Sequence, residues 1–184
     1  MKKVVALLLV MTSFNSTIMA QQKVKEINRD LKINSPIEEV WRVVGHEYAD
    51  AYKWASSLKH SEALDSVSLN GSSCTERGCD IDGFGQITEK MLAYSDEEHL
   101  LSYEVTSGLP KFVIKTENTW KLLAASEGKT NVEIRMKMQT KGFLGWLLGG
   151  IMERKTGKLL DGSLEELKYY VETGKIHPRK LKAS

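Results

Sequence analysis

The side chains best suited to chemistry in this sequence are polar residues that strand alternation places among apolar ones. Residues 86–94 are predicted to form a strand. Glu89 lies two residues from both Ile87 and Met91, so its side chain shares their apolar face. Tyr103 lies on the apolar face of the next predicted strand. An inward glutamate beside a tyrosine can act as a buried acid or base, or can anchor a ligand hydroxyl or a water. Pairing of Glu89 with a nearby lysine, or a solvated position at the rim, remains an equal alternative.

A second polar pair follows in residues 112–122. The same alternation places Phe112 and Trp120 inside together with Thr116 and Asn118. A buried polar group without a partner costs about 1–3 kcal/mol, so both side chains are expected to bond to something. Backbone, water, a strand bulge that exposes them, or a ligand would each satisfy that expectation.

Two further elements must position these groups. Residues 132–138 alternate cleanly and turn Met136 and Met138 toward the same interior. Residues 143–174 have apolar side chains at three- and four-residue steps, which predicts a long C-terminal helix. Its first half combines glycines with Trp146 and Ile151, a loose and apolar composition that suits a lid over a binding site. The alternative is a helix that only closes the core. The apolar residues of this half expected to face the core are Leu144, Leu147, Leu148 and Ile151.

The first twenty residues have the pattern of a secretory signal peptide. Lys2 and Lys3 precede a short apolar run, and small or polar residues lead to Ala20. The apolar run is too short to span a bilayer, so a membrane anchor is the weaker alternative. We therefore expect an exported protein, periplasmic or secreted, with residues 1–20 removed.

The charge balance argues against a nucleic-acid partner. The chain has 26 lysine and arginine residues against 24 acidic ones, and loss of Lys2 and Lys3 would balance them. A nucleic-acid-binding protein would show a clustered basic face. Basic residues cluster only in residues 175–184, which we expect to be a flexible tail with at most weak contact with acidic membrane headgroups.

Cys74 and Cys79 lie in one segment rich in glycine and serine. In an oxidising compartment a disulfide closing this short loop is the favoured interpretation. A reactive thiol pair is an alternative, although the spacing is wider than the two-residue spacing of oxidoreductases. Zinc fits poorly because no second pair of ligands is present.

No sequence motif points to a metal or a cofactor. The four histidines do not have metal-ligand spacing, and the sequence contains no phosphate-binding loop, dinucleotide fingerprint or nucleophile elbow. We therefore expect neither a metal site nor a cofactor. The histidines are His46, His60, His99 and His177.

The order of predicted elements is a strand, two short helices, six strands and a long helix, in one α+β domain over residues 21–174. A curved antiparallel sheet of about seven strands, wrapped around the C-terminal helix, encloses more space than side chains readily fill. This helix-grip frame resembles the START-like, or SRPBCC, superfamily, which includes the polyketide cyclase and dehydrase family. The matching segments are INSPIEEVWRVV, GQITEKMLAYSDEEHLLSYEV, TENTWKLL and LEELKYYVETG.

The resemblance implies a cavity for a small hydrophobic ligand, such as a lipid, a polyketide-like compound or an isoprenoid. By analogy with relatives, Glu89 occupies an inward acidic position, and Lys59 falls near the place where plant abscisic acid receptors hold a ligand carboxylate. The alternative function is a cyclase- or dehydratase-type enzyme with Glu89 as acid or base. The superfamily has no common catalytic residue, so binding without catalysis is the leading hypothesis.

Overall fold

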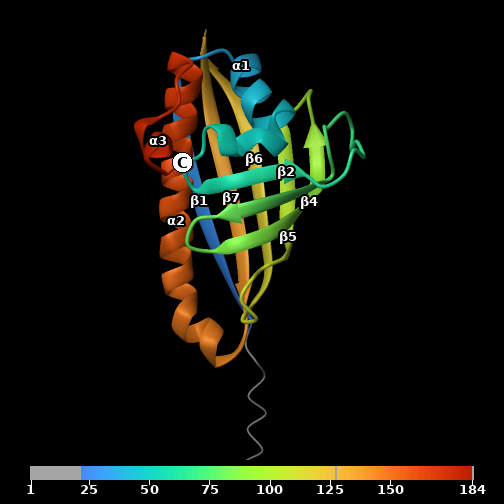
Figure 1. Ribbon diagram of the computed structural model, residues 1–184, viewed down its shortest axis with the longest axis vertical. Helices are drawn as coiled ribbons and strands as arrows, with labels where there is room; N and C mark the ends of the chain where they lie inside the picture. The colour runs from blue at the N-terminus through green and yellow to red at the C-terminus, as the bar shows by residue number, and fades with distance from the viewer. Residues whose placement is uncertain (1–21, 127, 184) are drawn as a thin grey trace, which may run out of the picture.

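The computed structural model describes residues 22–126 and 128–183, so the predicted signal peptide lies outside the described residues. Seven antiparallel strands form one sheet in the order β1-β7-β6-β5-β4-β3-β2 (Figure 1). This confirms the predicted helix-grip fold. The elements are β1 (Lys23–Ile33), α1 (Ile37–Trp41), η1 (Arg42–His46), η2 (Tyr48–Lys53), β2 (Leu58–Ala63), β3 (Glu76–Ile81), β4 (Gly85–Ser95), β5 (Leu100–Ser107), β6 (Val113–Ser126), β7 (Lys129–Thr140), α2 (Gly142–Thr173) and α3 (Pro178–Ala183).

The long helix α2 runs along β1 and β7, antiparallel to β7 (Figure 1). Its second half packs through Leu160, Leu164 and Leu167, the face that the sequence periodicity predicts. Gly174 ends the helix with a left-handed backbone, φ 66°, which glycine adopts without steric cost. In the described part of the chain, none of the helices combines the length and the apolar character that a membrane span requires.

The first half of α2 is turned the other way from the prediction. Gly145 and Gly149 face the sheet, while Leu144 and Leu147 are about half exposed, at 54% and 51%. A Cβ atom on Gly145 would lie 3.0 Å from Thr140 Cβ, so any larger residue would force this close approach to widen. The expectation that the larger apolar residues of this half face the core was therefore wrong.

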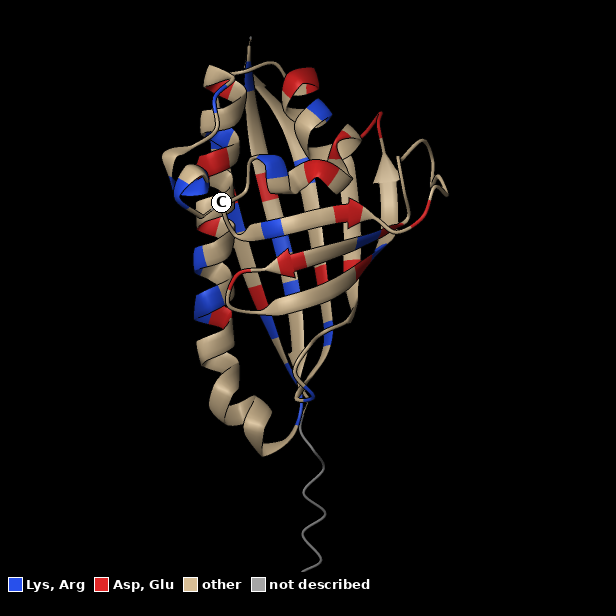
Figure 2. Cartoon of the chain, in the orientation of Figure 1, with Lys and Arg blue, Asp and Glu red and all other residues tan. Residues whose placement is uncertain are grey.

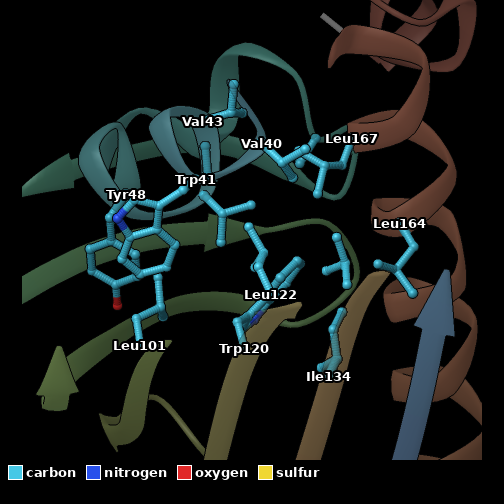
Figure 3. Packing of buried hydrophobic residues seen from close by; sticks show 14 of the residues in the cluster. Val40, Trp41, Val43, Tyr48, Leu101, Trp120, Leu122, Ile134, Leu164 and Leu167 are labelled. Carbon is cyan, nitrogen blue, oxygen red and sulfur yellow. The ribbon is translucent and has the colours of Figure 1, made fainter. Parts of the chain in front are cut away.

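The end of the molecule where β1 runs into α1 is densely packed (Figure 3). Val40, Leu122, Ile134 and Leu167 are each at most 1% exposed. Buried polar groups there are satisfied, since Thr130 Oγ1 donates to Ser35 O at 2.8 Å. We call this region the packed end.

The residues expected to be a flexible basic tail instead form α3, which docks on the body of the protein. Lys180 is buried, and its Nζ donates to Leu58 O at 2.9 Å. Arg179 donates to Glu165 Oε2 at 2.7 Å and lies 3.0 Å from Glu166 Oε1. These contacts to α2 and to the start of β2 hold the C-terminal segment in place.

Candidate functional site

A cavity of about 170 Å³ lies between the sheet, the η2 segment and α2. The strands β3 to β7 contribute one wall through their inward side chains, and α2 closes the space with side chains from its middle turns. We call this region of the molecule the hollow end. The lining residues that carry the argument below are Tyr48, Trp54, Arg77, Glu89, Thr116 and Asn118.

A buried ion pair crosses the wall of the cavity. Arg77 on β3 and Glu89 on β4 are directly opposite each other in the strand register, and both side chains are only 6% exposed. Arg77 Nε donates to Glu89 Oε2 at 2.7 Å, and its Nη1 donates to Tyr48 O at 2.6 Å. The guanidinium lies 3.8 Å from the ring centre of Tyr48, a cation–π contact. Arg77 is therefore fixed by partners on three sides.

The hydrogen bonds to the Glu89 carboxylate all go to one of its two oxygens. Its Oε2 atom accepts from Arg77 and from the Tyr48 hydroxyl at 3.2 Å. Cys79 Sγ lies 3.6 Å from the same oxygen. Within the described residues, Oε1 has no donor. Glu89 therefore acts first as the counter-ion of Arg77.

Burial shapes the protonation of this cluster. Burial opposes the charge on Arg77, but Glu89, Tyr48, Cys79 and Tyr103 together outweigh that cost, so the pKa of the guanidinium stands above its usual value. Burial raises the pKa of the Cys79 thiol to about 12. Burial, reinforced by Glu89, also raises the pKa of the Tyr103 hydroxyl. Cys79 and Tyr103 are therefore neutral at ordinary pH.

Three buried polar atoms in the cavity wall lack a partner in the described part of the protein. They are Trp54 Nε1, Thr116 Oγ1 and Asn118 Oδ1. The Asn118 amide nitrogen does have a partner, since it donates to the Tyr103 hydroxyl at 2.9 Å. Buried polar atoms are almost always satisfied in native proteins, so these three mark positions where a water or a polar group of a ligand would bond.

The structure places most of the predicted site residues in this wall. The predicted ligand contacts that line the cavity are Glu89, Tyr103, Thr116, Asn118, Trp120, Met136 and Met138. They come from four consecutive strands of the sheet, β4 to β7, and strand alternation alone was enough to bring them together.

Phe112 and Met91 do not line the cavity. A register shift between Val113 and Lys115 puts Val113 in the wall in place of Phe112, so the predicted parity fails at the start of β6. Met91 is buried, at 4%, but it packs in the core beside the cavity. The prediction that Phe112 and Met91 face the cavity was therefore wrong.

Lys59, Trp146 and Ile151 also lie away from the cavity. Lys59 is on β2 and pairs with Asp82 at 3.2 Å, so the analogy with a carboxylate-binding lysine does not hold. Trp146 and Ile151 are 69% and 51% exposed on the outer side of α2. They point outward because glycines occupy the inner side of that half of the helix.

The predicted disulfide is absent, and both cysteines are free and buried. Cys79 belongs to strand β3, where it faces Glu89, and Cys74 precedes the strand and packs in the core. The segment was interpreted as one loop, but its second half is a strand with an inward thiol.

Sequence reasoning missed Arg77 and Tyr48. Arg77 shares strand parity with Cys79 and Ile81, a pattern that could have been recognised had residues 76–81 been interpreted as a strand. A predicted inward glutamate also requires a cation, because a buried charge is rarely left unpaired. Within the described residues, no group of three or more His, Cys, Asp or Glu side chains is placed to hold a metal ion.

Comparisons with known proteins agree with this architecture. No curated protein sequence matches the chain. Among solved structures, truncated norcoclaurine synthase from Thalictrum flavum is similar with a TM-score of 0.68 at 13% identity, over 85% of this chain and 98% of that one. A START superfamily protein from Mycobacterium smegmatis is similar with a TM-score of 0.64 at 14% identity, over 82% and 99% of the two chains. At these identities the similarity shows the fold alone.

The sequence itself matches one family model, described as polyketide cyclase / dehydrase and lipid transport, over residues 25–172. The match includes every strand that lines the cavity and nearly all of α2. It confirms the resemblance derived from the sequence segments, and the chain belongs to the polyketide cyclase / dehydrase and lipid transport family.

Proposed function

We propose that this protein is an exported binding protein for a small, uncharged, hydrophobic ligand that carries one hydrogen-bonding group. The observation that carries the proposal is the set of unpaired polar atoms, Trp54 Nε1, Thr116 Oγ1 and Asn118 Oδ1, in an otherwise apolar cavity. A hydroxyl group on the ligand can accept from an indole N–H and donate to an amide oxygen. Family membership supports a hydrophobic ligand of this general kind.

The charge of the wall supports an uncharged ligand. Arg77 and Glu89 are the charged residues that line the cavity, and they neutralise each other. A ligand carboxylate would have to compete with Glu89 for Arg77, three of whose five N–H groups already bond to Glu89 and to Tyr48 O. A buried charge without a partner is costly, so a ligand with a net charge is disfavoured.

The size of the cavity supports a compact ligand. A cavity of about 150 Å³ in another protein stays dry and binds benzene, and the cavity here measures about 170 Å³. Met136, Met138 and Met152 in its wall are flexible enough to adapt to somewhat larger shapes. Within the classes that the sequence suggests, a ring compound of polyketide or isoprenoid type fits better than a lipid with long acyl chains.

The proposal gives Glu89 a framework role. Its Oε2 atom is bonded to Arg77 and Tyr48, which favours Glu89 as the counter-ion that positions Arg77 over proton transfer to a substrate. Export is supported by the signal-peptide pattern of residues 1–20. N-terminal sequencing of the protein from its own host tests that part, and we expect the mature chain to begin near Gln21.

The first experiment is native mass spectrometry of protein purified from its host. We expect a neutral ligand of one or two rings to co-purify. The second is titration with naphthalene, 2-naphthol and 2-naphthoate, which differ only in the polar group. We expect 2-naphthol to bind about 2- to 12-fold more tightly than naphthalene, the value of one hydrogen bond, and 2-naphthoate to bind most weakly.

Asn118→Leu is the matched variant for this series. It removes the unpaired Oδ1 acceptor while keeping a side chain of similar size, so the preference for 2-naphthol over naphthalene should shrink. A protein that binds none of the three probes and carries no ligand from its host would overturn the proposal.

A further inference from the structure

The start of α2 presents an apolar surface to solvent that the cavity does not explain. Phe143 and Trp146 are 70% and 69% exposed, with ring centres 5.8 Å apart. We call this surface the α2 apolar face; its members are Phe143, Leu144, Trp146, Leu147 and Ile151. Contiguous exposed apolar side chains of this kind mark an interaction surface.

The fold does not require these residues to be apolar. Gly145 and Gly149 make the contact with the sheet, so the outward positions between them could be polar without affecting the packing. Two large aromatic side chains held outward on a helix are typical of surfaces that enter the boundary between water and lipid. The apolar character therefore points to a partner.

The charges around this face are mainly basic, and the first acidic side chain along α2, Glu153, is paired with Lys25. Thr140, just before α2, pairs with Lys23 of β1 and with Val113 of β6, so three segments meet at this end. None of residues 22–25, 105–116 and 134–152 is acidic. Figure 2 shows basic residues at this end of the strands and an uncharged first part of α2. Lys23, Lys111 and Lys141 are exposed there, and no ion pair to them is found within the described residues.

We propose that this end of the protein docks on the surface of a membrane that contains anionic phospholipids. The lysines would meet the lipid headgroups, and Phe143 and Trp146 would enter the headgroup boundary. A second copy of the chain fits less well, because a symmetric contact would bring the same unpaired lysines together.

Docking here would also bring the cavity close to the bilayer. Leu109, Val113 and Met138 in the cavity wall belong to the segments that carry or adjoin these lysines, and Met152 follows the apolar face directly. The membrane would then act as a reservoir for a hydrophobic compound. The docking itself rests on the surface alone and does not depend on what the cavity holds.

The test is co-sedimentation of the protein, as processed in its own host, with vesicles of phosphatidylcholine alone or of phosphatidylcholine with phosphatidylglycerol. We expect binding only to the anionic vesicles, weakened by added salt. Trp146→Ser should weaken binding about tenfold or more, and Lys141→Glu about fivefold or more. The matched controls are Val67→Ser, at another exposed apolar residue, and Lys129→Glu, at the opposite end of β7. Neither control should change binding.

Fluorescence gives a direct second readout. Of the four tryptophans, Trp41, Trp54 and Trp120 are at most 8% exposed, so Trp146 alone can respond to lipid. We expect its emission to shift to the blue and to be quenched by brominated lipids. Unchanged melting temperatures would show that the variants are folded.

Three results would overturn the proposal. One is absence of binding to anionic vesicles. Another is binding that is equal for wild type and for both patch variants, which would assign it to residues 1–20 or to another surface. The third is self-association in sedimentation velocity that Trp146→Ser abolishes while vesicles remain unbound, which would make a second copy the occupant.

Discussion

The packed end and the hollow end of this molecule share strands, but they differ in whether their buried polar atoms have hydrogen-bond partners. At the packed end, Trp41 Nε1 donates to Asp96 Oδ1 at 2.7 Å, and Thr130 Oγ1 donates to Ser35 O. At the hollow end, the corresponding atoms of Trp54 and Thr116 have no partner in the described residues. The same residue types are satisfied in one place and unsatisfied in the other.

This difference separates stability from recognition. A satisfied, void-free core contributes to folding, whereas an unsatisfied polar atom costs free energy that only a ligand or water can recover. In this chain the inward polar residues of the hollow end include the buried Arg77–Glu89 pair. The predictions below test whether the two ends behave differently.

The largest effect is expected from breaking the buried ion pair. Arg77→Met leaves Glu89 buried without its partner and should lower the free energy of unfolding by about 3–5 kcal/mol. Combining it with Glu89→Leu removes the uncompensated charge and should restore most of that loss. Denaturant unfolding of the three proteins measures both effects. An Arg77→Met protein as stable as wild type would mean that the pair is solvated in solution.

The two halves of α2 should respond very differently to truncation. Leu167 at the packed end is 0% exposed, so Leu167→Ala should cost about 2–5 kcal/mol. Ile151 in the first half is 51% exposed, so Ile151→Ala should change stability by no more than about 0.5 kcal/mol. Equal losses in chemical denaturation would show that the first half packs on the body of the protein.

A matched pair of threonine variants isolates the contribution of one side-chain hydrogen bond to stability. Thr130→Val at the packed end removes a bonded hydroxyl and should cost about 1 kcal/mol or more. Thr116→Val at the hollow end removes an unbonded hydroxyl, so the ligand-free protein should keep its stability or gain slightly. Thermal unfolding of both variants checks this order, and the reverse order would show that Thr116 is bonded.

The two ends should also differ in their response to pH. At the hollow end burial raises the pKa of Cys79 to about 12 from a usual 9.0, so the folded state keeps a proton that the unfolded chain loses. Its contribution is complete below pH 9 and is lost as the pH rises toward 12. At the packed end, hydrogen bonds from Trp41, Tyr94 and His46 lower the pKa of Asp96, so its contribution is lost as the pH falls below about 4.

Cys79→Ala should therefore flatten the loss of stability between pH 9 and 12, and Asp96→Asn should flatten the loss in acid. Unfolding free energies measured across the pH range would show each slope. If neither variant alters how the unfolding free energy changes with pH, other titratable groups cause the pH dependence.

Alternation and element order were enough to predict the fold and seven of the residues that line the cavity, because strand periodicity follows directly from the pleat. The same rule failed at Phe112, since a bulge shifts parity without any sign in the hydrophobic pattern. For the first half of α2, hydrophobic periodicity also predicted the wrong helix face as the one that packs on the sheet. It counts apolar residues, whereas the close approach to Thr140 is made by Gly145. Arg77 was missed because a strand rich in polar residues resembles a loop.

The measurement that tests the central claim most directly is a pair of valine-to-phenylalanine variants. Val132 is 0% exposed at the packed end, and Val105 lines the cavity. Val132→Phe should lower stability by about 1–3 kcal/mol through overpacking and leave 2-naphthol binding unchanged. Val105→Phe should fill empty space, keep stability within about 1 kcal/mol, and abolish most 2-naphthol binding. If Val105→Phe binds the probe as wild type does, the cavity is not the binding site and the account is wrong.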